Sequence, residues 1–378
     1  MRGEAWRRAP LLLAVVLVAV GIPGSRPTAA HALAPTAGQS TYVPLDPVRI
    51  LDTRNGTGVP AGAVGAGGAI DVVVAGTAGV PVTATAVVLN VTATAPTAAT
   101  DVRVYPVPDD SAFVPTVSNL NVVAGRTVAN LVTSKLGRNG AVRLRNAAGD
   151  VHLIADVSGY YAEGAAGSSY ETTQPARLLD TRTDAAGAFG PGEVRTLLVR
   201  GGAPLSPSTS SAVALNVTAI AATEQTDVRV YPTRAGSGPP QVSNLNPPAG
   251  RTTPAAVIVA VGDDGTVSLR NAAGAVHLAV DLLGWYTPGT DAAVFHPVAP
   301  RRVLDTRSGA GSLGPGETRD LFVAGATVVP FAAQAVVVNV TAVGATAASD
   351  VRVYPRPAAP SDPPNASNLN VVAGQTAS

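Results

Sequence analysis

The chain has no cysteine, a single lysine (Lys135) and few aromatic residues, with 5 Phe, 2 Trp and 8 Tyr among 378 residues. The absence of cysteine excludes disulfides, thiol catalysis and cysteine-ligated metal sites. Its formal net charge is only +1, so it lacks the electrostatic footprint of a nucleic-acid-binding protein. We therefore expect apolar cores alone to hold the fold together, and we expect no nucleic-acid partner.

The N-terminus carries the features of a secretory signal peptide. Arg2, Arg7 and Arg8 precede an apolar run, Leu11 to Val20, and small residues follow it. The run is too short to cross a bilayer. We predict a signal peptide over residues 1–32 and a secreted product, extracellular or cell-wall associated, with no membrane span after its removal. The two adjacent arginines leave twin-arginine export open beside general secretion.

The chain contains three tandem copies of one module of roughly 120 residues. The string LDTR begins at Leu51, Leu179 and Leu304. Further strings recur in the same order: [LV]NVTA from residues 89, 215 and 338, DVRVYP from 101, 227 and 350, SNLN from 118, 243 and 367, RNAAG from 145 and 270, VHL from 151 and 276, and the closes GYY from 159 and GWY from 284. These positions predict modules at 42–163, 170–288 and 295–378. Small, polar segments at 162–169 and 287–293 are typical of short flexible linkers.

The third copy is shorter than the other two. Ser378 aligns with Ala129 of the first copy, so no counterpart of Asn130 to Tyr161 is present. Losing about three strands leaves sheet edges unpaired. We expect the third module to be unstable alone. An incomplete reading frame or a missing downstream domain would explain the short copy equally well.

Apolar residues alternate with polar ones within each copy, as in strands that bury one face. In the first copy this pattern predicts strands over 70–74, 86–92, 101–105, 128–136, 141–145 and 151–157. Turn signals separate them, including Arg138-Asn139-Gly140 and, in the second copy, Asp263-Asp264-Gly265, which is typical of a two-residue hairpin. The predicted fold class is all-β, with tandem antiparallel β-sandwich modules; a jelly roll is one such sandwich.

Recurring polar residues on the outward strand faces are the candidate ligand-binding residues. They are Asp101, Arg103, Tyr105, Arg145, His152 and Asp156 in the first copy, and Asp227, Arg229, Tyr231, Arg270, His277 and Asp281 in the second. If their strands are neighbours, they form one stripe that could bind sugar hydroxyls or a carboxylate. The alternative is a solvated face with cross-strand ion pairs. Arg143 of the first copy becomes Ser268 in the second, which argues against a strict site there.

LDTR is predicted to be a structural motif at a strand end. In this interpretation the aspartate accepts backbone N–H bonds and the arginine binds a neighbouring carbonyl or carboxylate. The residues are Asp52 and Arg54, Asp180 and Arg182, and Asp305 and Arg307. The alternative is direct contact with a ligand.

The remaining patterns indicate neither an enzyme nor a metal site. The spacing of His152 and Asp156 on one strand, about 13 Å, is too long for a catalytic dyad. Phosphate-binding loops, HExxH and G-x-S-x-G are absent, so we predict no catalysis, no cofactor and no metal. The asparagines of SNLN could contribute to a calcium site, but no acidic loop accompanies them. The NVT sequences match the glycosylation pattern but lie in apolar strands, where we expect them to pack.

The ordered motif set resembles a repeat module of secreted actinobacterial proteins, an uncharacterised accessory domain that stands beside cell-wall hydrolases, peptidases or esterases. The resemblance implies an extracellular or cell-wall-associated protein and carries no established ligand. We therefore expect a non-catalytic protein that binds cell-envelope or extracellular polysaccharide; the alternative is a passive structural spacer or stalk for a missing or partner domain. The oligomeric state does not follow from the sequence.

Overall fold

A computed structural model describes residues 39–109, 114–309, 311–325, 328–357 and 362–378. The predicted signal peptide, 1–32, lies outside the described residues. The described part of the chain is all-β, with no α-helix and one 3₁₀ turn, η1 (Arg138–Gly140). The predicted fold class is therefore confirmed.

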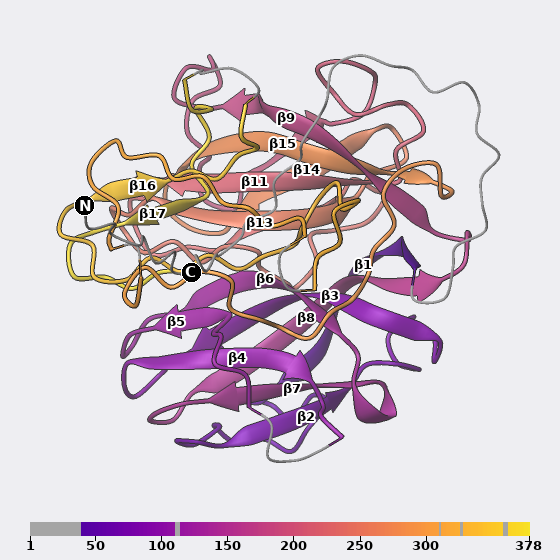
Figure 1. Ribbon diagram of the computed structural model, residues 1–378. Coiled ribbons are helices and arrows are strands. Elements are labelled where there is room, and N and C mark those ends of the chain that lie inside the picture. The colour runs from indigo at the N-terminus through magenta and orange to yellow at the C-terminus, as the bar shows by residue number, and fades with distance from the viewer. Residues whose placement is uncertain (1–38, 110–113, 310, 326–327, 358–361) are drawn as a thin grey trace, which may run out of the picture.

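Module 1 is a sandwich of two four-stranded sheets (Figure 1). The large sheet has the order β1-β8-β3-β6, made by β1 (Ser40–Asp52), β8 (His152–Glu163), β3 (Ala84–Thr94) and β6 (Val128–Lys135). The small sheet has the order β2-β7-β4-β5, made by β2 (Ala69–Val73), β7 (Ala141–Asn146), β4 (Thr100–Pro106) and β5 (Leu120–Val122). Apolar residues from both sheets form one buried core, in which Leu89, Leu144 and Leu153 are completely enclosed.

Module 2 repeats this sandwich. Its large sheet consists of β9 (Ser168–Asp180), β15 (His277–Pro288), β11 (Ala212–Ile220) and β13 (Thr253–Ala260), in the order β13-β11-β15-β9. Its small sheet consists of β10 (Val194–Leu198), β14 (Thr266–Asn271) and β12 (Val228–Pro232). The sandwich has a separate apolar core.

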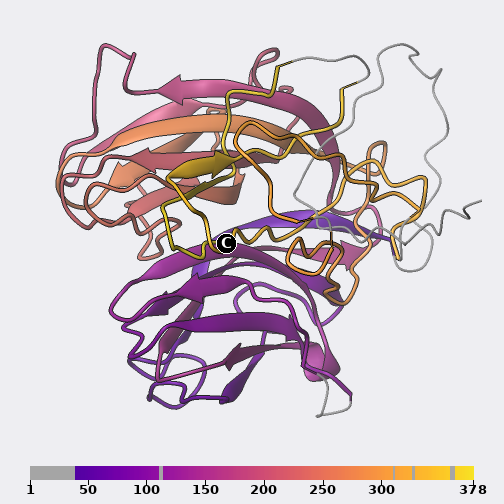
Figure 2. The same ribbon diagram turned by 60° about the vertical axis from the view of Figure 1, so that its left-hand side comes forward.

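Module 3 has little regular structure in its described residues. Only β16 (Ser349–Val351) and β17 (Leu369–Val371) pair, and they correspond to β4 and β5 of module 1. Its C-terminal part lies close to the junction of the first two modules (Figure 2), where the Ser378 hydroxyl donates to the Asn119 carbonyl.

The predicted strands of module 1 are confirmed within one or two residues at most ends, although β8 runs on to Glu163. The hairpin predicted at Asp263-Asp264-Gly265 is wrong. Strands β13 and β14, which flank this turn, lie in different sheets. The turn therefore carries the chain across the sandwich, because β13 pairs with β11 and β14 pairs with β10 and β12.

The expected flexible linkers are partly strand. Strand β8 ends at Glu163 and β9 begins at Ser168, so only residues 164–167 separate them. Tyr42 of β1 pairs with Ser168 of β9, and the two large sheets thereby join into one eight-stranded sheet. Pairing between modules replaces the solvent contacts that a free linker would have.

Candidate functional site: the contacts between modules

Three backbone bridges connect the modules head to tail. Tyr42 pairs with Ser168, Tyr170 with Ala293, and Phe295 with Ser40. Tyr42, Tyr170 and Phe295 each lie nine residues before the leucine of LDTR, so the bridges are equivalent. Module 1 thus contacts module 2, module 2 contacts module 3, and module 3 returns to module 1, where the Ser40 and Phe295 backbones exchange hydrogen bonds of 2.9 and 2.8 Å. The contacts close a ring.

An aromatic cluster fills the middle of this ring. Tyr161 and Tyr286, the last residues of the GYY and GWY closes, join Tyr42, Tyr170 and Phe295 there. Ring centroids lie 4.2 to 5.2 Å apart, and the hydroxyls of Tyr161 and Tyr286 share a 2.8 Å hydrogen bond. Burial raises the pKa of Tyr286 to about 12. The closing tyrosines therefore seal the centre of the ring.

One arginine from each module reaches into its neighbour. The Arg49 guanidinium binds the Asp156 carboxylate at 2.8 Å and donates to the Gln241 carbonyl of module 2. Arg177 binds Asp281 and the Asn365 carbonyl of module 3 in the same way. In module 3, Arg302 donates to the Thr116 carbonyl of module 1. Sequence reasoning missed this arginine, whose only signal is its recurrence two residues before LDTR.

The NVT asparagines make a third set of equivalent contacts between modules. Asn90 donates to the Ser243 carbonyl, Asn216 to that of Ser367, and Asn339 to that of Ser118. Each accepting serine is the first residue of SNLN in the next module around the ring. Asn90 and Asn216 are buried. The expectation that these asparagines pack agrees with the burial of Asn90 and Asn216, whereas Asn339 is exposed.

The DVR arginine supports the loop on which the neighbour docks. Arg103 pairs with Asp101 at 2.6 Å and donates to the Pro115 carbonyl just before SNLN. The Asn119 side chain accepts the backbone N–H of Val104 at 2.7 Å. In modules 2 and 3, Arg229 and Arg352 donate to the carbonyls of Pro240 and Pro364. The side chains of Asn244 and Asn368 accept the backbone N–H groups of Val230 and Val353. DVRVYP and SNLN thus build one docking loop.

The LDTR residues fold into a compact turn at the end of the first strand. The Asp52 carboxylate accepts the backbone N–H of Arg54 at 3.0 Å and two bonds from its guanidinium. Equivalent bonds join Asp180 to Arg182 and Asp305 to Arg307. The arginine bonds lower the pKa of all three carboxyls, that of Asp180 to about 2.

The threonine of LDTR binds the histidine of VHL. The Thr53 hydroxyl lies 3.0 Å from His152 Nδ1 and accepts the backbone N–H of Leu153. Thr181 and His277 repeat the arrangement in module 2. Both histidines therefore connect the turn to the last strand of their own module.

The candidate ligand-binding residues do not form one stripe, and that part of the expectation is wrong. In module 1, the small sheet carries Asp101, Arg103, Tyr105 and Arg145, and the large sheet carries His152 and Asp156. In module 2, the small sheet or its edge carries Asp227, Arg229, Tyr231 and Arg270, and the large sheet carries His277 and Asp281. The two sets belong to opposite layers of the sandwich. Alternation along one strand does not reveal which sheet that strand joins.

Burial separates these residues further. Asp156 and Asp281 are each only 2% exposed, and both are paired with the docking arginines. Burial raises the pKa of Asp156, an effect that outweighs the opposing influence of Arg49. Tyr105 and Tyr231 are also buried. These groups stabilise the fold and the junctions between modules.

Two arginines of the small sheets remain without an ion-pair partner among the described residues. Arg145 lies opposite Arg103 on the neighbouring strand, and Arg270 lies opposite Arg229. The Nη1 atom of Arg270 is shielded and makes no hydrogen bond there. Both residues are partly exposed.

The change from Arg143 to Ser268 is matched on the adjoining strand. Arg143 pairs with Asp71 at 2.6 Å, whereas Ser268 lies opposite Thr196 in the equivalent register. An ion pair in module 1 is thus replaced by two hydroxyl residues in module 2.

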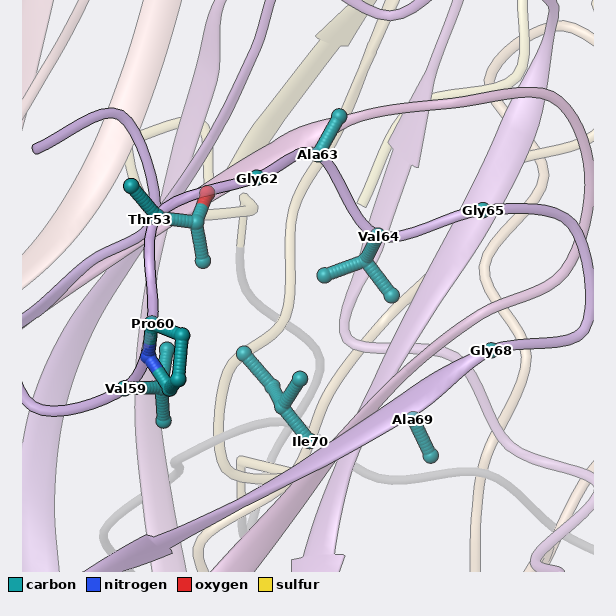
Figure 3. Close-up of a pocket in the computed structure, with 11 residues that line it drawn as sticks. Thr53, Val59, Pro60, Gly62, Ala63, Val64, Gly65, Gly68, Ala69 and Ile70 are labelled. Carbon is teal, nitrogen blue, oxygen red and sulfur yellow. The ribbon is translucent and has the colours of Figure 1, made fainter. Parts of the chain in front are cut away.

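A shallow hollow of about 410 Å³ lies beside the LDTR turn of module 1 (Figure 3). Its lining is small and apolar, and its single hydroxyl, that of Thr53, is occupied by His152 and Leu153. It therefore contains no activated nucleophile. Across the described ranges, no cluster of three or more metal-ligating side chains occurs, and no helix there has the length and apolarity to span a membrane.

Comparison with known proteins found no matching family model and no matching curated protein.

Proposed function

We propose that this protein is a non-catalytic, exported structural protein whose three modules form one rigid ring, rather than a string of independent domains. The observation that carries this proposal is the threefold recurrence of the same contacts at each junction. LDTR, NVT, DVR and SNLN all hold a module together or dock it to the next. The function that best fits such a chain is a spacer or platform on the outside of the cell.

The compact ring is tested by small-angle scattering of the mature chain. A compact body of this size has a radius of gyration of about 20 Å. The double variant Asn90→Ala and Asn216→Ala removes two docking bonds and should increase this radius, while far-ultraviolet circular dichroism stays unchanged. An extended wild-type particle, or a double variant with the wild-type radius, would contradict the ring.

A polysaccharide-binding role is the second candidate, supported by Arg145 and Arg270, which are partly exposed and have no ion-pair partner among the described residues. Guanidinium groups bind carboxylates and sugar hydroxyls. The test is sedimentation with purified cell walls and insoluble polysaccharides. The variant Arg145→Ala with Arg270→Ala should lose binding, and Arg126→Ala, at an exposed loop arginine, is the matched control. If the wild type does not sediment above background, this candidate fails.

We also infer that each complete module is a jelly roll. In module 1, successive strands cross repeatedly between the sheets and give the orders β1-β8-β3-β6 and β2-β7-β4-β5. The resemblance to the accessory modules of secreted actinobacterial proteins supports a place at the cell envelope for this chain.

A further inference from the structure

The outer faces of the two small sheets each place two arginines side by side. Arg103 of β4 lies directly opposite Arg145 of β7, and Arg229 of β12 lies directly opposite Arg270 of β14. Directly opposite side chains of an antiparallel pair have Cβ atoms about 5 Å apart, and like charges there are destabilising. Each pair therefore costs free energy unless negative groups compensate both guanidiniums.

One carboxylate is available to each pair of arginines, and it is already bound. Asp101 pairs with Arg103 at 2.6 Å, and Asp227 pairs with Arg229 at the same distance. A second donor of each of these arginines binds a backbone carbonyl of the docking loop. Among the described residues, no carboxylate pairs with the second arginine of either face. Each face therefore carries one uncompensated positive charge.

The next position along the same face is different. Arg143 of β7 pairs with Asp71 of β2 at 2.6 Å. In module 2 both members of this ion pair are replaced together, by Ser268 and Thr196. The position of Arg145, in contrast, holds an arginine without a carboxylate in both modules. The unpaired arginine is therefore a repeated feature of the module and not the remnant of a lost ion pair.

The surroundings leave the unpaired arginines accessible. Arg145 and Arg270 are both partly exposed. The turn before β2 approaches Arg145 with backbone alone, because it carries Gly67, where a Cβ would lie 3.7 Å from Arg145 Nη2. A Cβ at Gly192, the counterpart in module 2, would meet no atom within 4 Å. Strands β2, β4 and β7 lie on the side of module 1 that faces away from module 2 (Figures 1 and 2).

In module 2 the excess charge lies beside buried groups. Burial raises the pKa of Tyr231, and the Ser268 hydrogen bond and the guanidiniums of Arg270 and Arg229 oppose this effect. The Arg270 Nη1 atom is shielded from solvent and has no hydrogen-bond partner among the described residues. A shielded donor of a charged group costs free energy when it is unpaired. An anion bound at the exposed part of this guanidinium would compensate its charge.

We propose that each small-sheet face binds one anionic group of an acidic polysaccharide, held by Arg145 in module 1 and by Arg270 in module 2. This ligand chemistry rests on the polysaccharide-binding role, the second candidate function above. One uncompensated charge per face matches a group with one negative charge, a carboxylate or a phosphodiester. A guanidinium binds either group through charge-assisted hydrogen bonds, and a polymer that reaches both faces gains avidity.

The experiment is a calorimetric titration of the mature chain with a short oligogalacturonate, whose units each carry one carboxylate. A short poly(glycerol phosphate), whose units carry phosphodiesters, is titrated in parallel. We expect saturable binding of two oligomers per chain for at least one of them, and the tighter one identifies the anionic group. The uncharged methyl ester of the oligogalacturonate and free glycerol are the neutral controls, which should bind at least about tenfold more weakly.

Substitutions separate two defined sites from general attraction between charges. The double variant Arg145→Ala with Arg270→Ala should bind the preferred oligomer at least about tenfold more weakly and keep the wild-type melting temperature, because neither arginine has an ion-pair partner among the described residues. The matched control is Arg126→Ala with Arg251→Ala, at the AGRT arginines of the same two modules. It removes the same charge and should bind as the wild type does. The single variant Arg145→Ala should retain one site per chain.

Three results would overturn the inference. They are no saturable binding of either anionic oligomer, equal binding of the neutral controls, and equal weakening by the two double variants. Sedimentation with neutral polysaccharides but no preference for the anionic oligomers would reject acidic ligands and leave the second candidate function standing. Failure to bind any polysaccharide would reject both, whereas the scattering test of the ring is independent of either result.

Discussion

Replacement of Arg49 by alanine should destabilise the protein far more than its partly solvent-exposed position suggests. Arg49 binds the carboxylate of Asp156 in its own module and the carbonyl of Gln241 in module 2. Its side chain is 27% exposed, but that of Asp156 is only 2% exposed. Removing the arginine therefore leaves a buried carboxylate without its cation.

The magnitude follows from this stranded charge. Breaking a buried ion pair from one side costs about 3–5 kcal/mol. We take this range to include the lost hydrogen bond to the Gln241 carbonyl, which costs less than the stranded charge. The cost should depend on pH, because the pKa of Asp156 is already raised by burial and rises further without Arg49. At neutral pH the ionised carboxyl carries the full penalty. The penalty shrinks as pH falls through the raised pKa of this carboxyl, and it disappears below the ordinary aspartate pKa of about 4.

Urea unfolding of wild type and Arg49→Ala, followed at several pH values, measures this cost. The control is Arg234→Ala, because the Arg234 side chain is 31% exposed but its partners, Asp46 and Asp263, are 62% and 78% exposed, and exposed pairs contribute less than about 1 kcal/mol. The variant Arg49→Ala with Asp156→Asn should recover part of the loss. A loss below about 1 kcal/mol for Arg49→Ala, or a loss independent of pH, would refute the reasoning.

Four further predictions concern other parts of the molecule. Gly159→Ala should lower the melting temperature strongly, because its Cβ would lie 2.3 Å from the Tyr42 hydroxyl oxygen, and calorimetry would contradict this with an unchanged value. The raised pKa of Tyr286, about 12, means that stability present below pH 10 is lost as pH rises toward 12; tyrosinate absorbance should therefore appear together with unfolding, not before it. The lowered pKa of Asp180, about 2, means that its contribution is present above about pH 4 and lost toward pH 2, and Asp180→Asn should flatten this part of the acid-unfolding curve. Limited proteolysis should cleave residues 295–378 first, whereas a resistant fragment of that range would show that module 3 is stable.

The fold was largely predictable because it depends on local patterns. Alternation of apolar and polar residues marked β4, β7 and β8, since side chains of a strand point to opposite faces in turn. Strand β1 was not predicted, and its alternation is weak, because the stretch after Tyr42 contains two prolines, Pro44 and Pro47. Sheet membership was also beyond the pattern, because alternation reports a buried face without naming the partner strand.

The candidate site was only partly predictable. Repetition identified Asp101, Arg103 and Asp156 as a recurring set, but their separation onto two sheets depends on pairings between strands distant in sequence. Arg49 was overlooked because a lone arginine before LDTR has no chemical signature by itself. Its importance comes from a carbonyl 192 residues away in the chain.

The amino-acid sequence by itself determined the module, its copy number, its strands and its lack of thiol chemistry, because these follow from composition, periodicity and self-similarity. Only the tertiary structure decided that the modules close on one another and that the repeated polar residues are mostly occupied by that closure. The physical reason is that docking relies on backbone carbonyls, such as those of Gln241 and Ser243. Every residue carries such a carbonyl, so the sequence alone cannot distinguish those that bind.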